Sequence, residues 1–202
     1  MKRKMLLALL CMVTIMASAQ VSWNAKAGLN LSNMRGEGES GDLKVGYNLG
    51  VGMEYAFNER WSLQPSLSLT AKGTRESDGG TTVQLNAVYL ELPVMAALRV
   101  PVSDRVNLVF GLGPYVAYGV GGKVSVSSDG VDISINTFGE TEGLASGMRR
   151  FDAGLALGVS VEMGKFSIRL DEQLGLANVA ASEGSGDSVH NNNISIGVGY
   201  RF

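Results

Sequence analysis

The sequence predicts an all-β fold, an eight-stranded antiparallel up-and-down transmembrane β-barrel. Three observations lead to it: apolar and polar residues alternate over eight long runs, the connections alternate between short and long, and one face carries much larger side chains than the other. Apart from the longer fourth run, the runs have roughly 10 to 14 residues, whereas a soluble strand usually has about five or six. Strands that cross a membrane need about 9 to 11 residues at their tilt.

The chain begins with a pattern typical of a secretory signal peptide. Lys2–Lys4 are basic, residues 5–16 are apolar, and small residues lead up to Ala19. The apolar run is shorter than the roughly 20 residues that a membrane helix requires. We therefore expect residues 1–19 to be removed and residues 20–202 to form a single outer-membrane β-barrel domain.

The composition of the expected mature chain excludes several classes of protein. The single cysteine, Cys11, leaves with the signal peptide, so neither a disulfide nor thiol chemistry is expected. Removing three of the 17 basic residues leaves 14 Lys and Arg against 19 Asp and Glu, a net charge of −5. A mildly acidic chain without a basic patch is a poor nucleic-acid binder, so no nucleic acid is expected as a partner.

The eight runs follow the chain with period-two alternation. In the first run, apolar or small residues at odd positions from Val21 to Leu31 alternate with small or polar residues. In the last run, the apolar face ends with Tyr200 and Phe202. Such alternation is the pattern of a strand with one polar and one apolar face. In chain order the runs cover residues 21–32, 45–57, 61–72, 83–100, 106–118, 151–163, 166–176 and 193–202.

The connections predict how these strands are arranged across the membrane. Residues 58–60, 101–105 and 164–165 are short connections. The remaining connections are long and polar, so we expect four extracellular loops. These expected loops are residues 33–44, 73–82, 119–149 and 177–191. An even number of strands places both termini on the periplasmic side.

Side-chain size indicates which face is outside, because a soluble barrel of the lipocalin kind shows the same alternation. The polar face is mostly Gly, Ala, Ser and Asn, which suits the crowded interior of a narrow barrel. The apolar face carries both Trp residues, and its aromatic residues gather at two levels, as at the two surfaces of a bilayer. The expected periplasmic girdle is Trp23, Tyr55, Phe57, Trp61, Phe166, Tyr200 and Phe202, and the expected outer one is Tyr47, Tyr118 and Phe151.

Ten charged residues fall on the small-residue face and are expected to form a lumen charge network. They are Lys26, Lys72, Arg99, Arg169 and Arg201 against Glu54, Glu91, Asp152, Glu162 and Asp171. Charges inside a narrow barrel must pair or stay hydrated. Their balance favours an ion-paired plug over a selective channel, which more often carries an excess of one sign.

Short motifs along most of the mature chain resemble the PorT-like outer-membrane β-barrel family, a porin-like group. They are Tyr89-Leu90-Glu91-Leu92-Pro93, Gly111-Leu112-Gly113-Pro114-Tyr115, Phe151-Asp152-Ala153-Gly154 and Gly175-Leu176. The terminal Tyr200-Arg201-Phe202 is similar to the aromatic-ended assembly signal of outer-membrane barrels. The resemblance implies location and shape rather than a ligand. Glu172 departs from it, because it stands where the family commonly has an outward aromatic residue.

Some positions do not fit the simple pattern. Glu172 lies on the lipid face by alternation. Three alternatives would account for it: a bulge that turns the side chain inward, a subunit contact that covers it, or a tolerated free-energy cost of a carboxyl group that faces lipid. Pro65, Pro93 and Pro114 interrupt strands of a sheet without edges, so we expect local bulges there.

Two further features lie in the expected loops. His190 is the only histidine, and it lacks an obvious orienting acid, so we expect a solvated loop residue. Asp129-Gly130 sits between apolar-alternating segments and predicts the turn of a hairpin that protrudes from the barrel. A functional interpretation of this hairpin is an exposed edge for strand addition to a partner.

These observations predict an integral outer-membrane protein with a narrow, plugged lumen and a structural or adhesive role. The alternative is a small-solute porin. We expect no enzymatic activity, no metal and no cofactor. Expected partners are outer-membrane lipid, the barrel-assembly machinery during insertion, and an extracellular or envelope partner that contacts residues 119–149 and 177–191.

Overall fold

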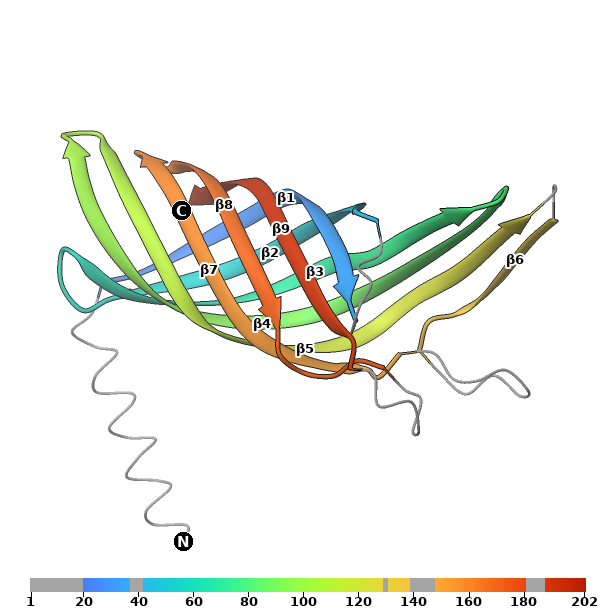
Figure 1. Cartoon of the computed structure of the whole chain (residues 1–202). Coiled ribbons are helices and arrows are strands. Elements are labelled where there is room, and N and C mark those ends of the chain that lie inside the picture. The colour runs from blue at the N-terminus through green and yellow to red at the C-terminus, as the bar shows by residue number, and fades with distance from the viewer. Residues whose placement is uncertain (1–19, 37–41, 129–130, 139–147, 181–187) are drawn as a thin grey trace, which may run out of the picture.

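The structure is a computed structural model that describes residues 20–36, 42–128, 131–138, 148–180 and 188–202. The expected signal peptide lies outside these residues. Strands make up most of the described chain (Figure 1). They are β1 (Gln20–Arg35), β2 (Lys44–Ala56), β3 (Trp61–Asp78), β4 (Thr81–Ser103), β5 (Val106–Ser128), β6 (Val131–Asn136), β7 (Phe151–Met163), β8 (Phe166–Gly175) and β9 (His190–Arg201). No helix among the described residues is long and apolar enough to cross a membrane.

Eight of these strands close into a ring, which confirms the predicted fold class. Each strand pairs antiparallel with the next around the ring, and β6 stands outside it. β1 closes the ring against β9 in a register that runs from Asn24↔Arg201 to Arg35↔His190. Because the ring is closed, none of its eight strands leaves an unpaired edge along the barrel wall.

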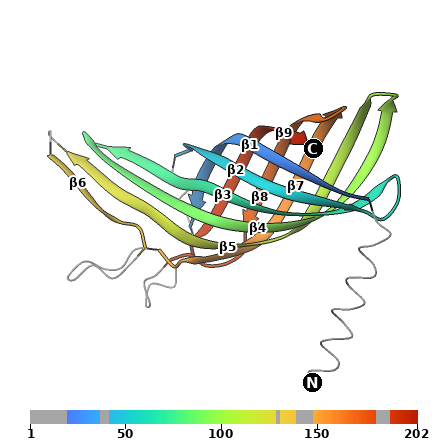
Figure 2. The same cartoon turned by 180° about the vertical axis from the view of Figure 1, so that it is seen from behind.

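The two ends of the barrel differ. At one end, here called the turn end, short connections join β2 to β3, β4 to β5 and β7 to β8, and the C-terminus also lies there (Figures 1 and 2). At the opposite end, here called the loop end, the connections join β1 to β2, β3 to β4, β5 to β7 and β8 to β9. The short connections predicted at residues 58–60, 101–105 and 164–165 thus all lie at one end, whereas the loop end also has one short connection, between β3 and β4.

The expected loops are, in large part, strand. β3 and β4 run to a turn at Gly79 and Gly80, whose φ angles of +55° and +89° fit a two-residue hairpin turn. β5 extends to Ser128 and pairs with β6 from Lys123↔Asn136 to Ser128↔Val131. The prediction that residues 73–82 and 119–149 are loops was thus wrong for most of 73–82 and for the hairpin of β5 and β6. These strands also carry many polar and glycine residues, such as Thr74, Arg75 and Ser77, so their composition resembles that of loops.

The extended strands form a projecting sheet beyond the loop end, made of residues 71–78 of β3, 81–88 of β4, 121–128 of β5 and all of β6 (Figure 1). β5 changes its neighbour as it leaves the barrel, because residues up to Tyr118 pair with β7 and residues from Lys123 pair with β6. The predicted β5–β6 hairpin is confirmed by this pairing. Its turn residues, 129–130, lie outside the described part of the chain.

The predicted bulges at Pro65, Pro93 and Pro114 are absent, so that prediction was wrong. The pairs Gly52↔Ser66 and Tyr55↔Leu63 keep one register on either side of Pro65. The same continuity holds around Pro93 and Pro114, and the shifts in the β4–β5 pairing lie elsewhere, at Val88/Tyr89 and Pro101/Ser103. A proline removes only its own N–H, whereas a register shift would turn the following side chains to the opposite face.

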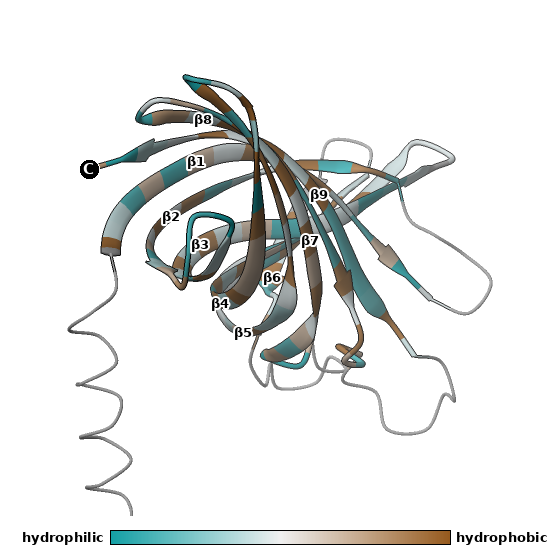
Figure 3. Ribbon diagram, turned by 90° about the vertical axis from the view of Figure 1, so that its left-hand side faces the viewer, coloured by the Kyte–Doolittle hydropathy of each residue, from teal (hydrophilic) through white to brown (hydrophobic). Residues whose placement is uncertain are grey.

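Alternation along each strand separates an inner from an outer face, visible as alternating hydrophilic and hydrophobic bands in Figure 3. On β7, Leu155, Leu157 and Val159 are exposed on the outside, while Asp152 and Ala156 are buried inside. The outer wall is therefore apolar and the interior polar. This is the reverse of a soluble barrel, which buries its apolar face.

Candidate functional site: the filled lumen and the projecting sheet

The deepest cluster of charges lies in the loop-end half of the lumen. Lys72 Nζ lies 2.5 Å from Glu91 Oε1 and 3.8 Å from Asp152 Oδ2, and each of these side chains is at most 2% exposed. β3, β4 and β7 each contribute one member. One cation therefore faces two carboxylates, which need further hydrogen bonds to balance their charge in a dry interior.

Polar neighbours supply those hydrogen bonds. Glu91 Oε2 accepts from Thr70 Oγ1 and from Gln173 Nε2, both at 3.0 Å. Asp152 Oδ2 accepts from Asn191 Nδ2 at 2.9 Å and from the Tyr115 hydroxyl at 3.3 Å. The cluster thus joins β3, β4, β5, β7, β8 and β9 across the lumen.

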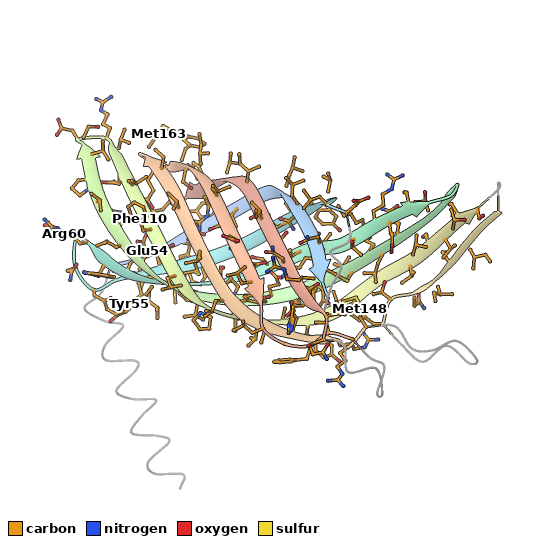
Figure 4. The ribbon with its side chains drawn as sticks, viewed as in Figure 1. Glu54, Tyr55, Arg60, Phe110, Met148 and Met163 are labelled. Carbon is orange, nitrogen blue, oxygen red and sulfur yellow. The ribbon has the colours of Figure 1, made fainter. Side chains whose placement is uncertain are left out.

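A second charge cluster closes the turn end of the lumen. Arg99 donates to Glu54 at 2.7 Å and to both oxygens of Glu162, at 3.0 and 3.2 Å. Arg201 reaches the same carboxylates at 3.7 and 3.9 Å. Glu54 is labelled at this end of the barrel in Figure 4. A guanidinium that binds two carboxylates from different strands ties opposite walls of the barrel together.

The other expected lumen charges are placed between these clusters. Arg169 pairs with Asp171 on its own strand at 3.1 Å. Lys26 donates to Ser66 Oγ at 3.0 Å, and no carboxylate among the described residues lies within ion-pair distance of it. The structure therefore brings nine of the ten charges into ion pairs and leaves Lys26 with a hydroxyl partner.

Little empty space remains between these side chains. The cavity at mid-lumen has a volume of about 50 Å³ and is lined by residues that include Lys26, Glu91 and Arg169. The cavity toward the turn end, beside Glu54 and Arg201, has about 30 Å³. One water molecule needs roughly 10–15 Å³ of such cavity volume, so each cavity holds only a few waters.

Aromatic residues cover the lumen at the loop end. Tyr89 and Tyr115 are buried inside, and the ring of Phe138 packs edge-on against Tyr89 with 5.5 Å between centroids. Phe138 occupies the space above Gly119, where a Cβ atom would collide with its ring. The guanidinium of Arg150 lies over the Phe138 ring at 5.5 Å and donates to the Gly119 carbonyl at 2.9 Å.

Several of these interior residues were not predicted from the sequence. The alternation directs Gln173 and Tyr115 inward without marking them as partners of the charges, and Asn191 falls in the expected loop 177–191, although the structure has it in β9. Phe138 follows β6 within an expected loop, and no periodic signal marks it. The ring covers the lumen only because β5 and β6 pair and bring it back over the barrel.

The remaining candidate positions are placed as follows. His190 begins β9 and its Nδ1 lies 3.1 Å from the Ala177 carbonyl oxygen, so it is hydrogen-bonded rather than solvated as expected. Within the residues that the structure describes, no three His, Cys, Asp or Glu side chains are grouped as a metal site would require.

The expected aromatic girdle at the turn end lies on the outer wall. Trp23, Phe57, Trp61, Phe166 and Phe202 are each between 49% and 70% exposed. Tyr55 packs edge-on against Phe57, and Tyr200 packs against both Phe166 and Phe202, with centroids 5.1 to 5.4 Å apart. Tyr47, Tyr118 and Phe151 are exposed nearer the loop end.

Glu172 also faces outward. It pairs with Leu157 of β7 and Ile194 of β9, both of which are exposed on the outer wall. The register of β8 continues without a shift on both sides of it. The alternative in which a bulge turns Glu172 inward is therefore wrong.

The projecting sheet has an apolar face that continues the inner face of the barrel. Val83, Val126 and Ile133 form one cross-strand row, and Leu85, Val124 and Ile135 form the next. Leu85 packs against the cluster around Phe138, whereas Ile133 is 61% exposed. The opposite face carries Arg75, Gln84, Ser125 and Ser134, which share another row.

A closed ring of eight strands with a polar, filled interior and an apolar outer wall defines the class of transmembrane β-barrel proteins. Residues 16–181 match the family described as outer membrane protein beta-barrel domain, and the chain belongs to this family. The protein is accordingly located in the outer membrane.

Several solved barrels resemble the chain at low sequence identity. Ail, the attachment invasion locus protein of Yersinia pestis, is 21% identical, with 91% of this chain and 99% of that chain covered and a TM-score of 0.48. Neisserial surface protein A is 13% identical, with 91% and 99% covered and a TM-score of 0.49. OprG from Pseudomonas aeruginosa is 11% identical, with 91% and 97% covered and a TM-score of 0.48. A search of curated proteins found no match to the sequence.

Proposed function

We propose that the protein is a non-conducting outer-membrane barrel that presents its projecting sheet to an extracellular partner. The observation that carries this proposal is the apolar face of the projecting sheet, with Ile133 61% exposed. These residues lie beyond the barrel wall, where lipid does not surround them. Exposed apolar rows in water are typical of surfaces that bind another molecule.

The filled lumen supports the non-conducting half of the proposal. Ion pairs link its walls at both ends, and the cavities of about 50 and 30 Å³ are too small for a solute path. The alternative function, a small-solute porin, needs a continuous water-filled path. The balanced charges act as a plug that stiffens the barrel beneath the projecting sheet.

The same proposal covers orientation and export. Residues 1–19 act as the signal peptide, the turn end faces the periplasm, and the barrel-assembly machinery inserts the chain. The connections at the loop end are the extracellular loops, and the motifs around Glu91 and Pro114 support placement in the PorT-like group. The proposal includes no enzymatic role, since the charged side chains of the lumen are mostly engaged in ion pairs with one another.

Two measurements test the proposed function. Purified protein in a planar bilayer should show no steady conductance, and a reproducible open current would support the porin instead. Cells that display Ile133→Asp should lose adhesion to surfaces that the wild type binds. Ser134→Asp, on the other face of the same strand, is the matched control and should adhere normally. Equal adhesion by both variants and the wild type would contradict a role for the apolar face.

A further inference from the structure

Lys26 is the lumen cation that bonds to a hydroxyl instead of a carboxylate, and glycines flank it. On the lumen face it pairs with Gly50 of β2 on one side and Gly199 of β9 on the other. Its ammonium group has three N–H donors, and one of them bonds to Ser66 Oγ at 3.0 Å. A charge enclosed in a barrel needs a counter-charge or water beside it.

The Ser68 hydroxyl lies beside the end of the Lys26 side chain. A Cβ atom on Gly50 would collide with Ser68 Oγ and would lie 3.0 Å from Lys26 Cε, so these two atoms are close neighbours above the glycine. Ser68 is 4% exposed, and its Oγ has no hydrogen-bond partner among the described residues. Both side chains line the mid-lumen cavity of about 50 Å³. An unused hydroxyl donor and unused ammonium donors therefore face one small space.

Arg169 brings a second cation to this cavity. It pairs with Gly197 of β9, just as Lys26 pairs with Gly199, so β9 places no side chain between the two cations. The Arg169 Cδ atom lies 3.9 Å from the position that a Cβ atom would take on Gly199. Nε and Nη2 of Arg169 donate to Asp171, and within the described part of the chain its Nη1 has no partner. Arg169 thus also has donors to offer to the cavity.

The two carboxylates that line the cavity are already engaged elsewhere. Asp171 is bound by Nε and Nη2 of Arg169, and Glu91 is bound by Lys72. Neither of them forms an ion pair with Lys26. Two cations with unused donors therefore border a space that no carboxylate of the described residues neutralises.

We propose that the mid-lumen cavity binds a small monovalent anion of the size of chloride, held by Lys26, Arg169 and the Ser68 hydroxyl. Such an anion accepts hydrogen bonds from all three groups and supplies the counter-charge that Lys26 lacks. A cavity that holds only a few waters takes a monatomic anion with part of its hydration shell, but not an organic ion. Water in the remaining volume donates to Asn193 Oδ1, an unpartnered acceptor of a residue that lines the same cavity.

The charges at the turn end also favour an anion. Lys26 and Arg169 line the turn-end cavity as well, so the two cavities adjoin at these side chains. The lining of the turn-end cavity carries four cations and two carboxylates, which are Lys26, Lys165, Arg169 and Arg201 against Glu54 and Glu162. An excess of positive charge in a narrow space raises the local concentration of anions.

Urea unfolding in two salts tests this site. The purified barrel in lipid vesicles is unfolded at equal ionic strength in sodium chloride or in sodium gluconate, whose anion is too large for the cavity, and tryptophan fluorescence reports the unfolding. An anion that binds only the folded state raises the folding equilibrium constant roughly tenfold when its concentration is about ten times its Kd. The wild type should show this rise in chloride. Equal stability in the two salts would overturn the proposal.

A variant without the Lys26 charge shows whether the effect arises in the lumen. Lys26→Met removes the charge at nearly constant side-chain length and should abolish the difference between the two salts. In gluconate it should be at least as stable as the wild type, because the change removes a charge without a counter-charge. Lys123→Met, at an exposed position of the projecting sheet, is the matched control and should keep the full effect of chloride. A full effect in Lys26→Met would place the anion elsewhere and contradict the proposal.

Two further measurements keep the test independent of the folding of Lys26→Met. Ser68→Ala retains both cations and should weaken the affinity for chloride roughly tenfold, because a hydrogen bond to a charged group is lost. Wild-type crystals soaked in sodium bromide should show an anomalous peak in the mid-lumen cavity. An unchanged affinity in Ser68→Ala, or bromide on the outer surface alone, would overturn the site. The inference goes beyond the proposed function, and none of these results depends on the projecting sheet.

Discussion

Lys72 and Glu91 form an ion pair of 2.5 Å inside the barrel, and Asp152 lies 3.8 Å from the same ammonium group. Three charges with a net charge of −1 are thus enclosed together. Lys72 is the only cation of this cluster among the described residues, and it also lies over the ring of Tyr115 at 4.7 Å. The cluster therefore depends on its lysine more than on either carboxylate.

Lys72→Met should destabilise the barrel more than Glu91→Gln. The first change leaves two buried carboxylates without their cation, and breaking a buried pair costs about 3–5 kcal/mol. The second leaves Lys72 facing Asp152 and keeps an acceptor for Thr70. Urea unfolding of the protein in lipid vesicles, followed by tryptophan fluorescence, gives both free energies of unfolding. Equal losses would show that the lysine is not the common partner.

Arg99→Lys should weaken the turn end although it keeps the positive charge. A lysine cannot donate to Glu54 and to both oxygens of Glu162 in the planar geometry of a guanidinium. Each lost hydrogen bond between charged groups is worth about 1.5–3 kcal/mol. Arg60→Lys, at an exposed position in the β2–β3 turn, is the matched control and should have no measurable effect on urea unfolding.

Gly119→Val should displace Phe138 from the mouth of the lumen. A Cβ atom at Gly119 would collide with the Phe138 ring, whereas a Cβ atom at Gly121 would have no neighbouring atom within 4 Å. Gly121→Val is therefore the matched control. Hydrogen exchange of the Thr137 and Met148 amides should speed up in the first variant only, since both donate backbone hydrogen bonds that hold this segment. Unchanged exchange in Gly119→Val would mean that the ring does not sit over the glycine.

The folded protein should be heat-modifiable in detergent gels. A closed ring of strands has no edge at which unfolding by SDS can begin, so unboiled protein should migrate differently from boiled protein. Identical migration of the two samples, together with solubility in buffer after osmotic shock, would instead indicate a soluble barrel.

Glu172→Leu should fold into vesicles and resist urea better than the wild type. A lipid-facing carboxylate is unfavourable, although less so than Lys or Arg, which cost about 2–4 kcal/mol at the midplane. Asp171→Leu is the contrasting variant, because Asp171 faces inward and pairs with Arg169. It should be destabilised. Failure of Glu172→Leu to fold would show that this residue faces the lumen.

The barrel strands were predictable because lipid on one side and a crowded lumen on the other impose strict alternation on each strand. Leu155, Leu157 and Val159 could only face lipid once Asp152 and Glu162 were assigned to the interior. The projecting sheet was not predictable in this way. Water lies on its outer face, and residues such as Thr74, Arg75 and Ser77 are typical of loops.

Inward charges were predictable individually, but their partners were not. Alternation places Lys72 and Asp152 on the inner face, yet these residues are 80 positions apart in the sequence and meet only across the lumen. Which charges meet depends on the register of every pair of strands between them. Lys26, predicted as a member of the lumen charge network, donates to Ser66 rather than to a carboxylate for the same reason.

β5 belongs to two structures along its length, because it exchanges β7 for β6 between Tyr118 and Lys123. The pairs Val88↔Gly121 and Tyr89↔Gly119 skip Val120, and this single unpaired residue re-aligns the strand as it leaves the membrane. The two segments of β5 on either side of Val120 therefore meet different physical requirements. On the barrel side of Val120, each side chain must suit either lipid or a filled lumen. On the other side, the β5–β6 hairpin can change its length and its side chains while the barrel keeps its strand pairing. A different hairpin could therefore be grafted onto β5 beyond Gly122, and the same membrane anchor would then display a different surface.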